Sequence, residues 1–275
     1  MGNTERNILI TNDDGIDSPG LLALANELAS LGKIWMVAPS QQFSGAGRAS
    51  LMTAKGLIEE RKKVIGGIEQ TVYAVDGMPA QAIHHGILEI CPQKPDLVVS
   101  GINYGENLST DVSISGTVGA ALEGASWGIP ALAVSVELVN IAKFLDHSTS
   151  VDFSTTAWFA RKFSELLLEK EMPEDVQVLK LDVPHDATPE TNWQITHLGR
   201  NRVFTPHVHP REDFSQPVKV TFEMHAGKDR FTEGSDVIVL KHDRLVSVTP
   251  LSLDMTSRMQ PNELDTLLRS NGHQI

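Results

Sequence analysis

Two adjacent carboxylates at the end of an apolar run are the first residues in this sequence whose types could do chemistry. Asp13 and Asp14 lie in Asn12-Asp13-Asp14-Gly15, directly after the run from Asn7 to Thr11. Neighbouring carboxylates repel each other unless a cation compensates them, and hard oxygen ligands select magnesium, manganese or calcium rather than zinc. The pair therefore predicts a divalent metal site, in which either carboxylate could also serve as general base. A solvated Asx-Gly turn is the alternative.

Two further loops offer oxygen ligands for a cation. Ser44 lies in the small-residue loop Phe43-Ser44-Gly45-Ala46-Gly47, and Asn103 lies in a glycine-punctuated segment from Ser100 to Asn107. The Ser44 hydroxyl and the Asn103 amide oxygen are both hard donors. Each loop taken alone is also typical of a flexible connection.

The segment Ser113-Ile114-Ser115-Gly116-Thr117 precedes an Ala- and Gly-rich stretch that is typical of a helix. The start of a helix presents unpaired N–H groups and a partial positive charge, which together bind phosphate. Hydroxyls of Ser115 and Thr117 could add donors, so the segment is a candidate phosphate site. Plain N-capping by a hydroxyl side chain is the alternative.

Strand-like and helix-like stretches alternate through the first half of the chain. The expected strands are Asn7 to Thr11, Ile34 to Ala38, Thr71 to Val75, Asp96 to Ser100 and Ala131 to Val136, and the expected helices are Leu21 to Leu31, Ala80 to Ile90 and Thr117 to Trp127. Continuous apolar strands that alternate with helices indicate a mostly parallel sheet flanked by helices, a three-layer Rossmann-like α/β fold. Ligands bind at the carboxyl ends of such strands, so the polar clusters after Thr11, Ala38 and Ser100 should meet in one crevice.

The second half of the chain has a different texture. The expected elements are an amphipathic helix from Asp152 to Glu169, a strand from Val176 to Val183, and short alternating strands at Gln194 to Leu198, Val218 to Met224, Asp236 to Leu240 and Leu245 to Thr249. We expect a single domain over residues 1–275. Its core would cover about 1–185, and about 186–275 would form an antiparallel extension with a C-terminal oligomerisation arm.

Composition excludes several classes of protein. With 35 acidic and 23 basic residues the net charge is −12, so the chain has no bulk attraction for nucleic-acid polymers. A small anionic substrate would need a local cation or oriented N–H groups. Cys91 is the only cysteine, which excludes an intrachain disulfide and any multi-cysteine metal site. Neither a bilayer-spanning run nor a secretory signal is evident, so we expect a cytoplasmic protein with no membrane partner.

The four polar segments together resemble those of the SurE family, the stationary-phase survival phosphatases. The shared motifs are Asn12-Asp13-Asp14-Gly15-Ile16 with Pro19-Gly20, Val37-Ala38-Pro39 leading to Ser44-Gly45-Ala46, Val99-Ser100-Gly101-Ile102-Asn103 with Gly105 and Asn107-Leu108, and Ser115-Gly116-Thr117-Val118. A loop with Gly77 and Pro79 and a strand from Val246 to Leu251 match as well. Each motif is modest, but together they follow the family's order over nearly the whole chain.

The resemblance implies a metal-dependent phosphomonoesterase that hydrolyses nucleoside 5′- and 3′-monophosphates, with polyphosphate as a further substrate of some members. The implied ligands of one divalent cation, Mg²⁺ or Mn²⁺, are Asp13, Asp14, Ser44 and Asn103, of which Asp13 and Asp14 are also the candidate catalytic residues. The implied phosphate-binding residues are Ser115, Gly116 and Thr117. The resemblance also implies a homodimer or homotetramer with exchanged C-terminal segments.

Three positions depart from the family pattern. Arg48 stands where the family usually has Asn, Asp17 replaces a residue that is often His or aromatic, and Met78 replaces the usual Thr. An arginine at position 48 could add a phosphate contact or fold outward. Substrate preference, including the choice between 5′ and 3′ positions, is therefore open.

Two other functions compete with the phosphatase. A nucleotide-cofactor oxidoreductase lacks support, because no Gly-x-Gly-x-x-Gly follows the first strand. A nucleotide-sensing module that binds metal and phosphate without turnover fits the same residues, and a phosphate-release assay would distinguish it.

His84 and His85 are expected on a helix surface. His207 and His209 could form a two-residue metal pair, but a solvated or interface loop is preferred because no third ligand is apparent.

Overall fold

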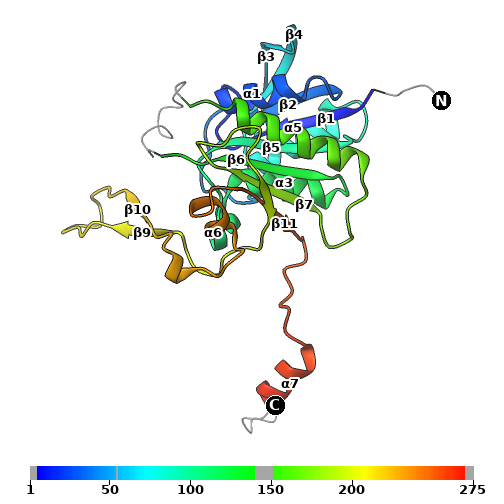
Figure 1. Cartoon of the computed structure of the whole chain (residues 1–275). Helices are drawn as coiled ribbons and strands as arrows, with labels where there is room; N and C mark the ends of the chain where they lie inside the picture. Colours follow the sequence, from blue (N-terminus) through cyan, green and yellow to red (C-terminus); the bar gives the residue numbers. More distant parts are fainter. Residues whose placement is uncertain (1–4, 54, 140–150, 270–275) are drawn as a thin grey trace.

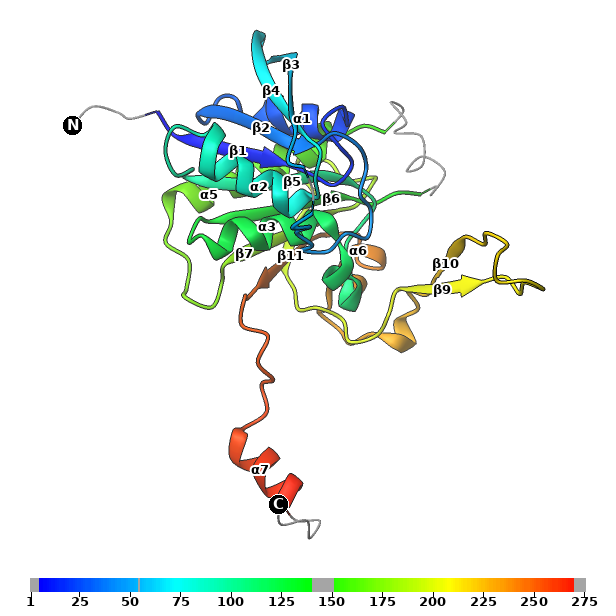
Figure 2. The same cartoon turned by 180° about the vertical axis from the view of Figure 1, so that it is seen from behind.

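The computed structural model of the protein describes residues 5–53, 55–139 and 151–269. Over these residues a nine-stranded sheet lies between two layers of helices (Figures 1 and 2). Its strands run in the order β3 (Ile58–Ile65), β4 (Ile68–Val75), β2 (Lys33–Pro39), β1 (Asn7–Thr11), β5 (Leu97–Tyr104), β6 (Ala131–Val136), β7 (Val178–Val183), β11 (Val246–Leu251) and β8 (Trp193–Ile195). The pairs from β4 through β7 are parallel, whereas β3 is antiparallel to β4 and β11 is antiparallel to β7. The predicted mostly parallel α/β sheet is confirmed.

The two helical layers are fixed by the alternation of side chains along the strands. Helices α1 (Pro19–Leu28) and α5 (Ser154–Glu169) cover one face, and α2 (Pro79–His85), continued by a π-helical turn over Gly86–Ile90, covers the other with α3 (Gly116–Ser126). Ile10 of β1 packs in the first layer and its neighbour Leu9 packs in the second. Because both faces are buried, these strands have no polar side and appear in the sequence as continuous apolar runs.

One predicted strand is wrong. The segment expected as a strand at Asp236 to Leu240 is helix α6, Asp236–Lys241. The Ser235 hydroxyl accepts a hydrogen bond from the Ile238 N–H at 3.4 Å, which is an N-cap. A run of four apolar residues, Val237 to Leu240, carries too little periodicity to separate a strand from a helix, so the cap is the informative signal.

Two strands were not predicted. β3 is rich in charged residues, and it forms an exposed hairpin with β4 through Gly66 and Gly67, whose φ angles are +60° and +80°. Glycine is favoured there because a two-residue hairpin turn needs positive φ. β9 (Phe204–Val208) pairs antiparallel with β10 (Val220–Met224) in a separate two-stranded sheet. We call these two strands with their connection the β9–β10 hairpin.

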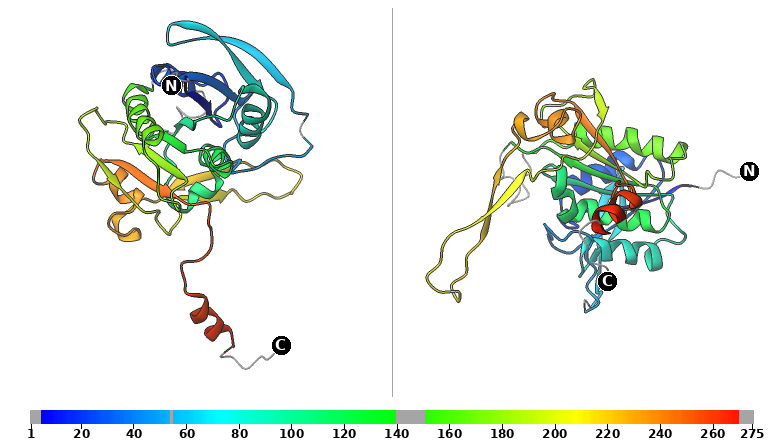
Figure 3. Two further views of the ribbon diagram at one scale, coloured as in Figure 1. Left: turned by 90° about the vertical axis from the view of Figure 1, so that its right-hand side faces the viewer. Right: turned by 90° about the horizontal axis from the view of Figure 1, so that it is seen from below.

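Two parts of the second half of the chain project from the body. The β9–β10 hairpin extends to one side, and helix α7 (Pro261–Arg269) lies beyond an extended segment, away from the sheet (Figures 1 and 3). Short 3₁₀ helices span Ser109–Ile114 and Lys228–Arg230. β8 and β11 lie after residue 185 in the sequence but belong to the main sheet. The expected core boundary near residue 185 therefore does not coincide with the edge of the sheet. The single domain stays a prediction. Among the described residues, every helix is too short or too polar to cross a bilayer.

Candidate active site

The carboxyl end of β1 turns sharply and presents Asp13. The Asn12 side chain holds this turn closed, because its Oδ1 accepts the Gly15 N–H at 3.0 Å and its Nδ2 donates to the Gly15 carbonyl at 3.2 Å. Gly15 has φ +98°, which favours glycine. The Phe43 N–H donates to the Asp13 carbonyl at 2.7 Å, so the loop that carries Ser44 is tied directly to this turn.

A bulge at the end of β5 positions Asn103. The register between β5 and β6 shifts between Ser100 and Asn103, and bulges of this kind redirect side chains near active sites. Gly101, at φ +137°, permits the bulge, because a Cβ there would lie 2.3 Å from the Val134 carbonyl oxygen. Asn103 Nδ2 donates to the Gly105 carbonyl at 2.6 Å. Its amide oxygen is therefore the group that can bind a cation.

One pocket joins these segments. It has a volume of about 510 Å³, and Asp13, Ser44, Asn103 and Ser115 line it together. The rest of its lining combines an apolar wall of Ile114, Leu138, Val139, Phe204, Phe222 and Met224 with the polar residues Glu106, Asn107 and Asp111. The strand ends predicted to meet in one crevice do so, and the N-terminus of α3 reaches the same pocket.

Residues at the start of α3 hold the Asp13 side chain in place. The Thr117 hydroxyl, fully buried, donates to Asp13 Oδ1. A Cβ at Gly116 would lie 2.7 Å from both Cβ and Oδ2 of Asp13, so only glycine leaves room for the carboxylate. The Ser115 hydroxyl accepts the Val118 N–H at 3.1 Å and is the N-cap of the helix. Thr117 is thus a positioning residue for Asp13, a role that the sequence analysis did not assign.

The electrostatics of the two carboxylates favour a bound cation. Asp13 and Asp14 are 5% and 1% exposed, and among the described residues neither makes an ion pair with a basic side chain. Burial raises the pKa of Asp13, against hydrogen bonds that include one from Thr117. Burial and then the charge of Asp13 raise the pKa of Asp14 well above its usual range. A divalent cation would remove this penalty.

The donor set fits such a cation. Carboxylate, hydroxyl and amide oxygens are the ligands that magnesium and manganese prefer. Asp14 differs from the other three implied ligands, because it does not line the pocket. Its Oδ1 accepts from Gln42 Nε2 at 3.2 Å and its Oδ2 from the Tyr104 N–H at 3.3 Å. Those hydrogen bonds orient the carboxylate, as partners of metal ligands commonly do.

The Arg48 side chain contacts Glu123 and is not part of the pocket lining. Its Nε is 2.7 Å from Glu123 Oε2, and His84 Nε2 is 2.9 Å from Glu123 Oε1. Arg48 does not line the pocket, so its contact with a phosphate stays a prediction. Asp17, the second departure from the family pattern, forms an ion pair with Lys63 of β3 at 2.8 Å.

A buried charge network next to the pocket was missed from the sequence. Lys180 of β7 contacts Asp182 and lies 3.2 Å from Asp236, and all three side chains are fully buried. Asp182 Oδ1 accepts the N–H of Asn107, a pocket residue, at 2.8 Å. The signal was present as two charged residues within the apolar strand Val-Leu-Lys-Leu-Asp-Val. Charges are rarely buried unless they are paired.

The apolar wall from the β9–β10 hairpin was missed as well. Phe222 and Met224 alternate with polar Thr221 and Glu223 along β10, and their side chains are 52% and 43% exposed. Because the period of a strand is two, these apolar residues share one face, and that face lines the pocket. Such exposed apolar surface beside a polar site is typical of ligand binding.

Comparison with known proteins decides the family. Residues 8–205 match the family model described as survival protein SurE. The chain belongs to the SurE family. It is 41% identical to the 5′-nucleotidase SurE of Thermococcus gammatolerans, with 95% of each chain covered. It is 39% identical to that of Archaeoglobus fulgidus, with 92% of this chain and 94% of the relative covered.

A solved SurE structure has the same fold. The SurE protein from Aquifex aeolicus superposes with a TM-score of 0.72 at 32% identity, and the match covers 95% of this chain and 99% of that one. The likeness therefore extends through the sheet and includes the second half of the chain. The family assignment inferred from the four polar segments is confirmed.

Proposed function

We propose that this chain is a 5′-nucleotidase, which hydrolyses nucleoside monophosphates to nucleoside and phosphate. The observation that carries the proposal is the division of one pocket into two parts. Asp13, Ser44, Asn103 and Ser115 form a polar end, an apolar wall lines much of the rest, and Glu106, Asn107 and Asp111 add polar groups. A nucleotide has the same two parts, a charged phosphate and a nucleoside with a flat base. The relatives in Thermococcus and Archaeoglobus carry the name of this activity.

The polar end would hold one divalent cation, Mg²⁺ or Mn²⁺. The proposed ligands are Asp13, Asp14, Ser44 and Asn103. When bound, the cation would neutralise phosphate charge and lower the pKa of a bound water. In a chain with net charge −12, such local compensation is what allows an anionic substrate to enter.

The chain's own groups would complete the chemistry at the phosphate. The N–H groups of Gly116 and Thr117, at the start of α3, form hydrogen bonds with Asp13, and they would also donate to the phosphate oxygens and stabilise their charge in the transition state. One of the two carboxylates, Asp13 or Asp14, would accept a proton from the attacking water. Thr117 would keep Asp13 in place for this role.

The apolar wall would receive the nucleoside. Phe204 and Phe222 come from the β9–β10 hairpin, and Ile114 lies just before α3. Stacking of a base on an aromatic side chain contributes about 1–3 kcal/mol and is tolerant of the base. The wall therefore favours nucleotides over inorganic polyphosphate and leaves the preferred base open.

The test is phosphate release from a panel of 5′- and 3′-mononucleotides, polyphosphate and p-nitrophenyl phosphate, with Mg²⁺ or Mn²⁺ and again with EDTA. We expect metal-dependent release that EDTA abolishes, and its loss in Asp13→Asn. No release from a folded protein that still binds nucleotide would instead support a nucleotide-sensing module. Equal turnover of mononucleotides and p-nitrophenyl phosphate would argue against a nucleoside-binding wall.

We further propose a homodimer or homotetramer with exchanged C-terminal segments, located in the cytoplasm. In support, α7 lies away from the sheet (Figure 3), and Leu264 and Leu268 are 41% and 68% exposed. An amphipathic helix that exposes leucines is suited to a second chain. Light scattering on wild type and on Leu264→Ser with Leu268→Ser should show a smaller assembly for the variant.

A further inference from the structure

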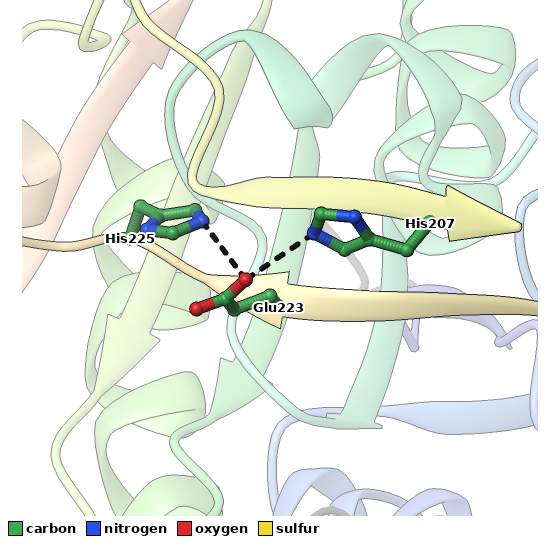
Figure 4. A group of neighbouring side chains, drawn as sticks. All are labelled: His207, Glu223 and His225. Atoms are coloured by element: carbon green, nitrogen blue, oxygen red, sulfur yellow. Dashed lines mark ion pairs between the residues drawn. The ribbon is translucent and has the colours of Figure 1, made fainter. Parts of the chain in front are cut away.

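Two histidines and a glutamate converge on the β9–β10 hairpin (Figure 4). His207 Nε2 lies 3.2 Å from Glu223 Oε2, and His225 Nε2 lies 3.6 Å from the same oxygen. One ligand atom from each residue lies within 4.8 Å of the other two. Both imidazoles thus point at one carboxylate oxygen, although the residues are 16 and 2 positions from Glu223 in sequence.

The pairing of the strands produces this convergence. His207 of β9 lies opposite Thr221 of β10, and Glu223 is the next residue along on the same face. His225 follows with the same period of two, and its N–H donates to the Val203 carbonyl at 2.7 Å, which extends the pairing past the end of β10. Diagonal neighbours on one face of an antiparallel pair are within reach of long side chains. The backbone therefore holds the three side chains on one side before any ion binds.

The spacing of the donor atoms suits a zinc ion. Zinc binds histidine nitrogen and carboxylate oxygen at about 2.0–2.2 Å with tetrahedral geometry, which puts neighbouring ligand atoms roughly 3.4 Å apart. The two N–O distances in the structure, 3.2 and 3.6 Å, bracket that value. Two imidazoles and one carboxylate are also a common ligand set of zinc sites with an open fourth position. Oxygen-selective magnesium would not prefer this donor set.

Among the described residues, no lysine or arginine forms an ion pair with Glu223, and the two histidines are its partners within ion-pair distance. A second cluster, Glu137, His185 and Asp186, also groups metal-ligand types. There Arg244 contacts both carboxylates, so a guanidinium already provides the positive charge. The geometry singles out the hairpin cluster.

We propose that His207, Glu223 and His225 form a zinc site on the β9–β10 hairpin, separate from the oxygen-ligand site in the pocket. The side chains are 53%, 62% and 33% exposed, so an ion enters directly from solvent. The fourth position is taken by water. His209, the other histidine of the Pro-His-Val-His-Pro segment, is not part of the cluster.

Zinc at this site would act on the pocket through the hairpin. His207 comes from one strand and the other two ligands follow from its partner, so the ion links the strands. A two-stranded hairpin alone is marginally stable. Phe222, whose side chain lies on the opposite face from Glu223, lines the pocket. A zinc link would therefore stiffen the nucleoside-binding wall. This effect rests on the proposed function, whereas zinc binding itself does not.

The test is zinc binding by full-length protein freed of metal. Wild type, His207→Ala with His225→Ala, and His209→Ala would each be dialysed against Zn²⁺, and bound metal would be counted per chain. The same three are then made in an Asp13→Asn background, so that zinc in the pocket does not obscure the count. Circular dichroism establishes that each variant is folded.

In each background, we expect the double variant to bind one zinc ion fewer than the protein with all three ligands intact. His209→Ala should bind as much zinc as that protein. Co²⁺ should give the strong visible absorption of a tetrahedral complex in wild type and His209→Ala, and lose it in the double variant. Equal zinc content in wild type and the double variant would overturn the proposal. Loss of the ion in His209→Ala would overturn the ligand assignment. Neither result depends on whether the protein hydrolyses nucleotides.

Discussion

Replacement of Gly116 by alanine tests how tightly the active-site geometry is held. The new Cβ would lie 2.7 Å from Cβ and Oδ2 of Asp13, whereas ordinary contacts begin near 3.4 Å, so the carboxylate or the helix start must move by about 0.7 Å. Asp13 cannot retreat freely, because Thr117 holds Oδ1 and the Phe43 N–H holds its carbonyl. The clash therefore displaces the groups that would meet the phosphate in the proposed reaction.

The size of the effect follows from two opposing terms. A displacement near 1 Å of a catalytic group costs on the order of 100-fold in rate, so we expect kcat/KM for a nucleoside monophosphate to fall roughly 30- to 100-fold. Overpacking costs about 1–3 kcal/mol of stability. The gain from replacing a helical glycine with alanine, at most about 1 kcal/mol, offsets part of this. Gly116→Ala should therefore stay folded.

A matched control lies on the same helix. A Cβ at Gly124 would lie 2.8 Å from the Val98 side chain, and it is eight residues, about 12 Å along the axis, from Gly116. Gly124→Ala should lose comparable stability in urea unfolding but keep the kcat/KM of wild type at saturating Mg²⁺. Retention of more than about a third of wild-type kcat/KM by Gly116→Ala would show that Asp13 is not held tightly in this way. Equal activity losses in both variants would mean that general disturbance of α3, not displacement of Asp13, is responsible.

Three further predictions concern residues around the pocket. Thr117→Val, which removes the hydrogen bond to Asp13, should lower kcat/KM or the affinity for Mg²⁺ by about 10- to 100-fold; a metal titration with unchanged midpoint and rate would contradict this. Lys180→Met leaves buried carboxylates without their cation and should cost about 3–5 kcal/mol, seen as a lower urea midpoint. Burial raises the pKa of Glu137, but interactions with Arg244, His185 and Lys241 outweigh it and lower that pKa from 4.5 to about 2. Glu137→Gln should therefore destabilise at neutral pH by on the order of 2 kcal/mol. That difference should shrink as pH falls below 4.5 towards 2, and a pH-independent difference would count against the ion pair.

Local sequence determined where the candidate site residues lie. Asp13 follows one buried strand and Asn103 lies near the end of another, both recognisable from short apolar runs, and Ser115 precedes a recognisable helix. Strand ends in a parallel sheet meet at one edge whatever the loops do. For this reason three of the four implied metal ligands and the helix start could be placed in one crevice without coordinates.

Tertiary structure decided which groups support those residues. The hydrogen bond from Thr117 to Asp13 joins residues 104 positions apart, and the pairing of Lys180 with Asp236 joins two elements of which one was assigned to the wrong class. Neither contact has a local period that a sequence pattern can reveal. The same applies to Arg48, whose partner Glu123 was not apparent from the chain.

The β9–β10 hairpin shows the division most clearly. Its sequence contains His207 and a distant Glu223 and His225, and only the antiparallel register brings them to one face. The alternation that puts Phe222 on the opposite face is local, but the sequence does not say what that face meets. Periodicity is a property of neighbouring residues and survives in the sequence, whereas register and docking depend on contacts between distant segments and exist only in the folded chain.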